Sequence, residues 1–150
     1  MAKYSIKLQA GPATKYEERI AAAATAIKPG HLVKPNGSTV NQCILNIADN
    51  TVCEVAMEDA LQAKTLNDVY AAAALVFTMI PAIGDAFLAR MAAATYTEGQ
   101  LLKAGASGQL IAVAAATDRV IARAEPLDTN DRPVVSAVVA ADGLMRVVKV

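Results

Sequence analysis

Two short apolar pieces alternate with glycines in the stretch Glu98–Leu110, which reads EGQLLKAGASGQL. A Gly-Asp pair, Gly84-Asp85, precedes this stretch and predicts a further turn. Glycine supplies the positive φ that tight turns between strands require. The pattern therefore predicts a compact all-β fold, a β-barrel or β-sandwich, with at most short helices.

Apolar segments separated by Gly, Asp and Asn turns continue to the end of the sequence, as in other all-β proteins. The strand candidates are Gln100–Lys103, Gln109–Val113, Val120–Ala124, Pro133–Val139 and Leu144–Val150. Earlier in the chain, Pro35–Ser38 contains an Asn-Gly pair, which favours a hairpin turn. This turn is expected to join a strand at Leu32-Val33 to one at Thr39-Val40.

Other segments fit more than one structure. Residues 15–26 are rich in Glu and Ala and helical by propensity, but a Pro-Gly pair follows, so we expect residues 19–27 to be extended. Leu75–Ile80 predicts a strand buried on both faces, whereas Ala86–Ala94 fits a strand or one helical turn. A short helical turn is expected at Glu58–Ala63.

The composition of the 150 residues indicates a small-residue core. Hydrophobic residues make up 55 % but aromatic residues only 4 %, and about one residue in five is alanine. Such side chains bury little area each, so the core would gain from burial against partner subunits, which suggests a homo-oligomer, a trimer or a dimer. No repeat of fixed period is visible. We therefore expect an extended N-terminal arm, residues 1–14, and a single β-rich domain, residues 15–150.

Charge and hydropathy exclude several classes of partner. The 14 basic and 14 acidic residues balance, and no basic stripe is present, which argues against nucleic-acid binding. The longest weakly polar stretch, Ala71–Ile83, is too short to span a bilayer, so no membrane partner is expected. The N-terminus lacks the apolar region of a secretory signal, and synthesis in the cytoplasm is the default expectation.

The two cysteines, Cys43 and Cys53, have no second pair and no histidine near them. Zinc sites use four ligands at tighter spacing, so we expect neither a metal nor another cofactor. Two free, buried thiols are expected, with a disulfide across a hairpin as the alternative.

Three side chains are the candidates for chemistry: His31, Asp85 and Glu98. A general base at His31 would need a nucleophile and an orienting carboxylate beside it. Asp85 follows a glycine and Glu98 precedes one, which is ordinary for turn residues. The sequence therefore predicts no catalytic site. A small β-barrel enzyme, the alternative, would require these side chains to converge.

The N-terminal segment alternates between apolar and polar residues, which predicts a strand or an extended arm. A lone strand is unstable in water and completes a sheet, either its own or that of a neighbour. The predicted contacts with a partner are Lys3, Tyr4, Ile6, Lys7 and Leu8.

The order of these elements resembles the small head decoration, or capsid cement, proteins of tailed bacteriophages. The motifs that carry the resemblance are Ile27–Val33, Asp68–Tyr70, Ile83–Asp85, Glu98–Leu102, Ser107–Leu110 and Val120–Glu125. It covers roughly residues 16–150 by order and spacing, and the chain departs from the pattern at Arg123, where members of the family often have Gly.

The resemblance implies a barrel, β-tulip or jelly-roll-like fold without chemistry of its own. It implies a virion protein that binds the outer surface of an assembled capsid and cements the major capsid protein subunits against internal pressure. Another virion subunit, of the tail tube or of head completion, is the alternative.

Overall fold

The computed structural model describes residues 6–22, 26–36, 39–45, 54–59, 61 and 65–150. It is almost entirely β-structure, which confirms the predicted all-β fold. Its strands are β1 (Lys7–Gln9), β2 (Lys15–Ala21), β3 (Leu32–Asn36), β4 (Thr39–Leu45), β5 (Glu54–Ala56), β6 (Leu75–Ile80), β7 (Ala86–Met91), β8 (Ala94–Thr97), β9 (Leu101–Ala104), β10 (Leu110–Ala112), β11 (Ala122–Ala124), β12 (Ser136–Val139) and β13 (Gly143–Lys149). A 3-10 turn, η2 (Ala106–Gly108), joins β9 to β10.

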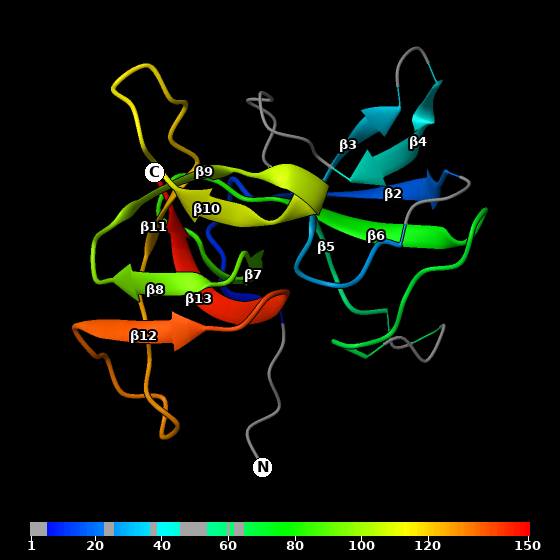
Figure 1. Cartoon of the computed structure of the whole chain (residues 1–150). Coiled ribbons are helices and arrows are strands. Elements are labelled where there is room, and N and C mark those ends of the chain that lie inside the picture. Colours follow the sequence, from blue (N-terminus) through cyan, green and yellow to red (C-terminus); the bar gives the residue numbers. More distant parts are fainter. Residues whose placement is uncertain (1–5, 23–25, 37–38, 46–53, 60, 62–64) are drawn as a thin grey trace.

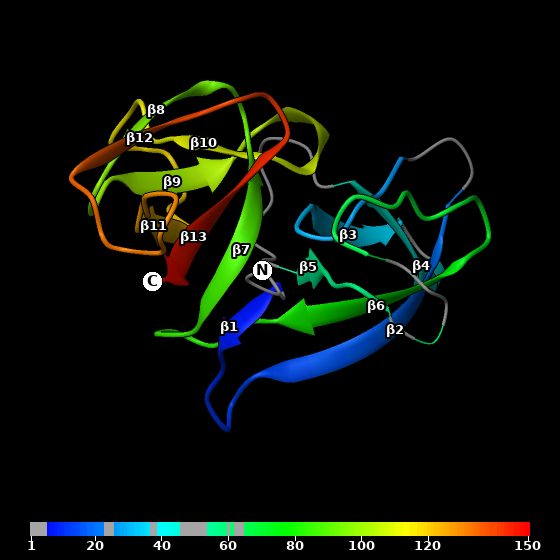
Figure 2. The same ribbon diagram turned by 90° about the horizontal axis from the view of Figure 1, so that it is seen from below.

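The strands form two barrels that lie side by side (Figures 1 and 2). The first closes in the order β2-β4-β3-β5-β6, and β6 pairs antiparallel with β2. The second follows the order β7-β10-β9-β11-β13 and closes through the pairing of β13 with β7. In the second half, β8 and β12 form a separate two-stranded ribbon.

The first barrel uses both faces of its strands, because successive side chains point to opposite faces. Val33 and Ala56 lie in a cluster inside the first barrel, together with Ala21, Ile27, Cys43, Tyr70 and Val76. Their neighbours Leu32 and Val55 point the other way and belong, with Met79, to the cluster that fills the second barrel. The outer face of the first barrel is therefore covered by the second barrel around Leu32, Val55 and Met79.

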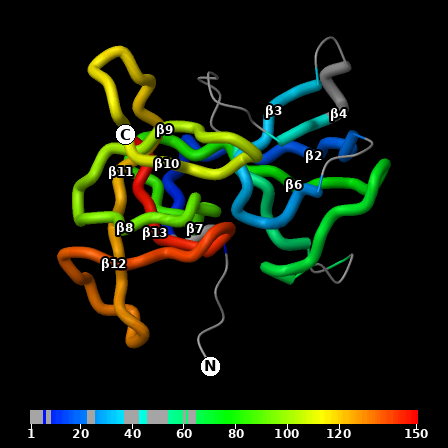
Figure 3. Tube along the Cα trace, viewed as in Figure 1, coloured from blue at the N-terminus to red at the C-terminus, as the bar shows by residue number. Residues whose placement is uncertain are grey.

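The two barrels have the same strand topology, as the path of the chain in Figure 3 shows. In each, the first strand pairs antiparallel with the last and parallel with the third, and the second lies between the third and the fourth. β2, β3, β4, β5 and β6 thus correspond to β7, β9, β10, β11 and β13. The β8–β12 ribbon corresponds to the isolated bridge between Ile27 and Tyr70 in the first half.

Hydrogen bonds in the turns align the halves residue by residue. Before β3, the N–H of Lys28 donates to Nδ1 of His31 at 3.1 Å. Before β9, the N–H of Thr97 donates to Oε1 of Gln100 at 3.0 Å. Gly30 and Gly99, within these turns, both have positive φ, 90° and 76°.

The turn that precedes the last strand of each barrel also matches. The N–H of Ala73 donates to the carbonyl of Ala21, and the N–H of Asp142 donates to that of Met91, both at 2.9 Å. Ala73 and Asp142 have φ of 62° and 61°, a region that non-glycine residues rarely occupy. The strand registers extend this match to Glu18 with Leu88, Ile20 with Arg90, Leu32 with Leu101, Val55 with Arg123 and Leu75 with Leu144. The chain is a tandem structural repeat, although inspection of the sequence shows no fixed period.

Most strand expectations are confirmed. All five C-terminal candidates are strands, as is Ala86–Met91. Residues 19–21 are extended despite their helical propensity, because β6 pairs antiparallel with β2 up to Ile20 and β4 pairs parallel with Ile20 and Ala21. β3 and β4 form the predicted antiparallel pair, while Gly37 and Ser38 of its turn lie outside the described residues.

One expectation is partly wrong, and another falls largely outside the described residues. Leu75–Ile80 is a strand, but only part of it is buried on both faces, because Leu75 lies at the exposed end where β2 stops. The expected helical turn at Glu58–Ala63 falls largely outside the described residues.

The described part of the N-terminal segment lies in the chain's own sheet. β1 pairs antiparallel with β7, and the N–H of Leu88 donates to the carbonyl of Ile6 at 2.8 Å. The side chain of Ile6 is buried in the shared core, and its N–H donates to the carboxylate of Glu58 at 3.0 Å. Lys3 and Tyr4, and the side chains of Lys7 and Leu8, lie outside what the structure describes.

The burial of Ile6 generates a prediction. Replacing Ile6 with Ala leaves a cavity in the shared core, so the free energy of unfolding should fall by about 2–5 kcal/mol. Urea titration followed by circular dichroism measures this change. Gln9→Ala, at an exposed position of the same strand, is the matched control and should change stability little. Equal stability of Ile6→Ala and wild type would show that β1 does not anchor the core.

Candidate functional site

Polar and charged side chains, buried or partly buried, meet at the joint between the two barrels. His31 precedes β3 in the first barrel, and its Nε2 lies 2.7 Å from Oδ1 of Asp142. Lys28 Nζ donates to the other oxygen of this carboxylate, Oδ2, at 2.8 Å. Asp142 belongs to the turn before β13, so its carboxylate connects the two halves.

Arg90 connects the same two turns from β7. Its guanidinium Nε donates to the carbonyl of Pro29 at 3.0 Å, Nη1 donates to the carbonyl of Asp142 at 2.6 Å, and Nη2 donates to the carbonyl of Leu66. The backbone N–H of Arg90 also donates to the carbonyl of Gly30 at 2.8 Å. One buried guanidinium therefore satisfies carbonyls from three loops.

The environment fixes the charge of each group. Burial lowers the pKa of His31 from 6.5, with the charges of Arg90 and Lys28 acting in the same direction against the hydrogen bond to Asp142. Because Nδ1 accepts the Lys28 N–H, the proton of the neutral ring is on Nε2 and points to Asp142. For Asp142, burial acts to raise the pKa, but hydrogen bonds from Lys28 and His31 and nearby positive charge lower it to about 2.

Two glycines allow the close approach of the halves. A Cβ on Gly30 would lie 2.7 Å from Cδ2 of Leu144 and 3.3 Å from Cγ of Arg90. A Cβ on Gly108, in η2, would lie 2.7 Å from the carbonyl oxygen of Leu32. Both positions also have positive φ, so a side chain would meet two obstacles there.

The predicted catalytic candidates lie in separate neighbourhoods. Both ring nitrogens of His31 are used at the joint. The Asp85 carboxylate accepts hydrogen bonds from the N–H groups of Gly11 and Ala82, each at 2.7 Å, and from the Thr14 hydroxyl, so it anchors a turn. Glu98 lies in the exposed β8–β9 turn. The geometry gives no support to the enzyme alternative, which needs these groups together.

The first barrel encloses a second polar group that sequence inspection missed. The buried Glu54 accepts hydrogen bonds from Arg19 and from the Thr78 hydroxyl, both at 2.6 Å, while its Oε2 has no partner among the described residues. Nearby, Cys43 is a free, buried thiol, and burial together with the charge of Glu54 raises its pKa to about 11. This thiol is therefore protonated and unreactive at neutral pH. Cys53 lies outside the described residues.

Within the described ranges, no group of three or more His, Cys, Asp or Glu side chains is placed to hold a metal ion. Nor does that part of the chain contain a helix long and apolar enough to cross a membrane.

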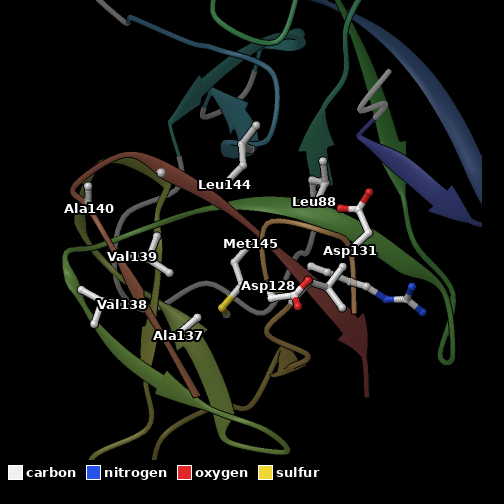
Figure 4. A pocket seen from close by; sticks show the side chains of 12 residues that line it. Leu88, Asp128, Asp131, Ala137, Val138, Val139, Ala140, Leu144 and Met145 are labelled. Carbon is white, nitrogen blue, oxygen red and sulfur yellow. The ribbon is translucent and has the colours of Figure 1, made fainter. Parts of the chain in front are cut away.

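A surface hollow of about 380 Å³ lies between β12, β13 and the loop that contains Asp128 and Asp131 (Figure 4). Apolar side chains dominate its lining, among them Leu88, Val139, Leu144 and Met145, and Asp128 and Asp131 lie at one side. The Asp128 carboxylate accepts N–H groups of its own loop, from Asn130 at 2.7 Å and Arg132 at 3.0 Å. These carboxylates shape a loop, and the hollow contains no catalytic arrangement.

Comparison with known proteins identifies a fold relative. No family profile and no curated protein matches the sequence. Among solved structures, the N base of the head fiber gp8.5 of bacteriophage phi29 is similar, with a TM-score of 0.57 at 13 % sequence identity. The match covers 91 % of this chain and 94 % of that chain. The two proteins therefore share a fold over both barrels.

The buried His31 predicts a pH dependence of stability. Because its pKa is lowered from 6.5 in the folded state, the unfolded chain binds a proton below about pH 6.5 that the folded chain does not. The free energy of unfolding should therefore decrease as the pH falls from 7 to 5. Denaturant titrations across this range measure the decrease. NMR titration of the imidazole, the single one in the chain, should give a pKa below 6.5.

His31→Gln is the matched control, because Gln100 accepts the equivalent hydrogen bond from Thr97 in the second half. The variant should fold and lose most of the stability decrease between pH 7 and 5. An imidazole that titrates at or above 6.5 would contradict the buried neutral state.

The equivalent glycines predict a difference between the halves. Gly30→Ala meets Leu144 and Arg90 as well as an unfavourable φ, whereas Gly99→Ala meets only the unfavourable φ, because nothing lies within 4 Å of its Cβ position. The φ alone should cost about 1–2 kcal/mol at either site. Thermal and urea unfolding should show a larger loss for Gly30→Ala. Equal losses would mean that the joint adapts to the methyl group.

Proposed function

We propose that this protein is a structural component of a bacteriophage head that binds the outer surface of the assembled shell. In that role it cements the major capsid protein subunits against internal pressure. The observation that carries the proposal is the fold likeness to a protein named as a head fiber base, which extends over both barrels. The resemblance of the sequence motifs to capsid decoration proteins supports the same role.

The physical character of the molecule agrees with a binding role. The buried polar groups at the joint hold the barrels together, and the catalytic candidates occupy separate neighbourhoods. A protein present in many copies needs only weak individual contacts, because each copy bridges subunits that are already held in place. In this proposal the protein is made in the cytoplasm of the bacterial host and becomes part of the virion.

The contact with the major capsid protein is assigned to the N-terminus. Ile6 is used by the chain's own core, so of the predicted contacts Lys3, Tyr4, Lys7 and Leu8 remain candidates, and the test below addresses Lys3 and Tyr4. Lys3 supplies a charge-assisted contact and Tyr4 an aromatic one, and tyrosine is among the residue types that contribute most where they are buried at interfaces.

Co-sedimentation with purified, expanded capsids tests the function. The protein should sediment with shells, saturate at a fixed number of copies per shell, and appear on the head in electron micrographs. Folded protein that binds no shell would overturn the proposal. Labelling of the tail in place of the head would favour the tail-tube or head-completion alternative.

Paired substitutions test the assigned contact. The double variant Lys3→Ala, Tyr4→Ala should bind shells roughly tenfold or more weakly, because it removes contacts of about 1 kcal/mol or more each. Ile83→Glu, at an exposed apolar position remote from the N-terminal residues in sequence, is the control and should bind normally. Unchanged binding by the double variant would remove these residues from the contact.

A further inference from the structure

The repeat gives each barrel two corresponding faces. At the joint, the first barrel contacts the second through Gly30, His31, Leu32 and Val55. We call this surface the turn face of the first barrel, and the equivalent residues form the turn face of the second. The second barrel contacts this turn face through β7 and the start of β13, with Leu88, Arg90, Asp142 and Leu144. We call this surface the strand-end face of the second barrel, and the equivalent residues form the strand-end face of the first. One turn face and one strand-end face are thus paired within the chain.

The turn face of the second barrel is uncovered in the single chain. A Cβ on Gly99 would have nothing within 4 Å, whereas one on the equivalent Gly30 would touch Leu144, Arg90 and Ile6. Leu101 is 47 % exposed, whereas the equivalent Leu32 is 0 % exposed. A leucine therefore stands in solvent at the position where its counterpart supports the joint.

The strand-end face of the first barrel is uncovered as well. Ile20 is 38 % exposed and Leu75 is 41 % exposed, while Arg90, the counterpart of Ile20, is 5 % exposed. Ala73, the counterpart of Asp142, is also exposed. The two uncovered faces lie at opposite ends of the molecule: the β8–β9 connection is at one end, and the start of β6 is at the other (Figures 1 and 2).

The uncovered faces are complementary in charge. Inside the chain, Val55 of the turn face and Leu88 of the strand-end face both belong to the shared apolar core. At the equivalent positions of the uncovered faces stand Arg123 and the exposed Glu18. The Arg123 side chain is 50 % exposed, and its Nη2 lies 3.4 Å from Oε1 of Glu125 in the same chain. Opposite charges thus replace two members of the shared apolar cluster, and leucines remain beside them.

From these correspondences we propose that a second copy of this chain docks head to tail. The turn face of the second barrel of one copy packs against the strand-end face of the first barrel of the next copy, in the arrangement that joins the barrels within the chain. Leu75 of one copy takes the place of Leu144 over Gly99 of the other, and Glu18 faces Arg123. Such an interface is heterologous, so each copy uses both faces and assembly continues until a ring closes.

Two substitutions that each destroy one face test the arrangement by sedimentation velocity and light scattering. Wild-type protein should form a concentration-dependent oligomer. Leu101→Glu, with a broken turn face, and Leu75→Glu, with a broken strand-end face, should each be monomeric, with association at least roughly tenfold weaker. Mixing the two variants should give a one-to-one dimer, because one intact face of each kind remains. Ile83→Glu, also at an exposed apolar position, should assemble as wild type does.

Circular dichroism and thermal unfolding confirm that each variant is folded, which is expected because both leucines are partly exposed. A monomeric wild type at the highest soluble concentration would overturn the proposal, as would folded variants that assemble like wild type. A mixture of the variants that stays monomeric would do the same. Failure of capsid binding leaves these outcomes unaffected, because the test needs only the chain itself.

The charge pair provides an independent test. Glu18→Arg and Arg123→Glu should each weaken self-association, because each places like charges opposite one another. Added salt should then strengthen the association of either single variant relative to wild type, because salt screens a repulsion in place of an attraction. The double variant carries the exchanged pair at every interface and should regain most of the wild-type association. Additive weakening in the double variant would show that the two residues do not face each other.

Discussion

The rest of the structure depends on the packing of the second barrel against the outer face of the first, at Leu32, Val55 and Met79. A barrel this small points half of its side chains outward, and here the outward set includes Leu32, Val55 and Met79. Each contributes about 1.5–3 kcal/mol when fully buried. Their gross burial energy is comparable in size to the net stability of an ordinary domain, roughly 5–15 kcal/mol, so exposing them would be enough to unfold the first barrel. The first barrel therefore needs the second as its neighbour.

The polar cluster at the joint fixes the orientation of the two barrels at this apolar contact. Apolar packing alone tolerates sliding, whereas the Asp142 carboxylate accepts from Lys28 and His31 at two distinct oxygens and so fixes one orientation. Burying these charges is costly, and the cost is offset only when every donor and acceptor is paired. The close approach at Gly30 and Gly108 brings the backbones near enough for this pairing.

Much of the fold could be predicted from the sequence because turns carry local signals. Gly84, Gly99 and Gly108 all adopt positive φ, and the strands between them follow from short apolar runs. The joint could not be predicted, since it is made by residues that look unremarkable alone: an arginine in β7 and an aspartate in a late turn. The N-terminal segment illustrates the same limit, because alternation predicts a strand but not its partner. Here β7 of the same chain is the partner of residues 7–9.

The repeat is visible locally in the sequence, because Gly30–Lys34 (GHLVK) resembles Gly99–Lys103 (GQLLK). The repeat has no fixed period in the sequence, because Cys43 corresponds to Leu110 and Ala56 to Ala124, so the spacing between counterparts changes from strand to strand. The turn glycines Gly30 and Gly99 are the same in both halves, and so are the leucines at the joint, since Leu32 and Leu144 have Leu101 and Leu75 as counterparts. The polar residues of the joint differ: Arg90 and Asp142 have Ile20 and Ala73 as counterparts. The halves therefore share one fold. They differ in the polar and charged residues of a face that is buried at the joint in one half and exposed in the other.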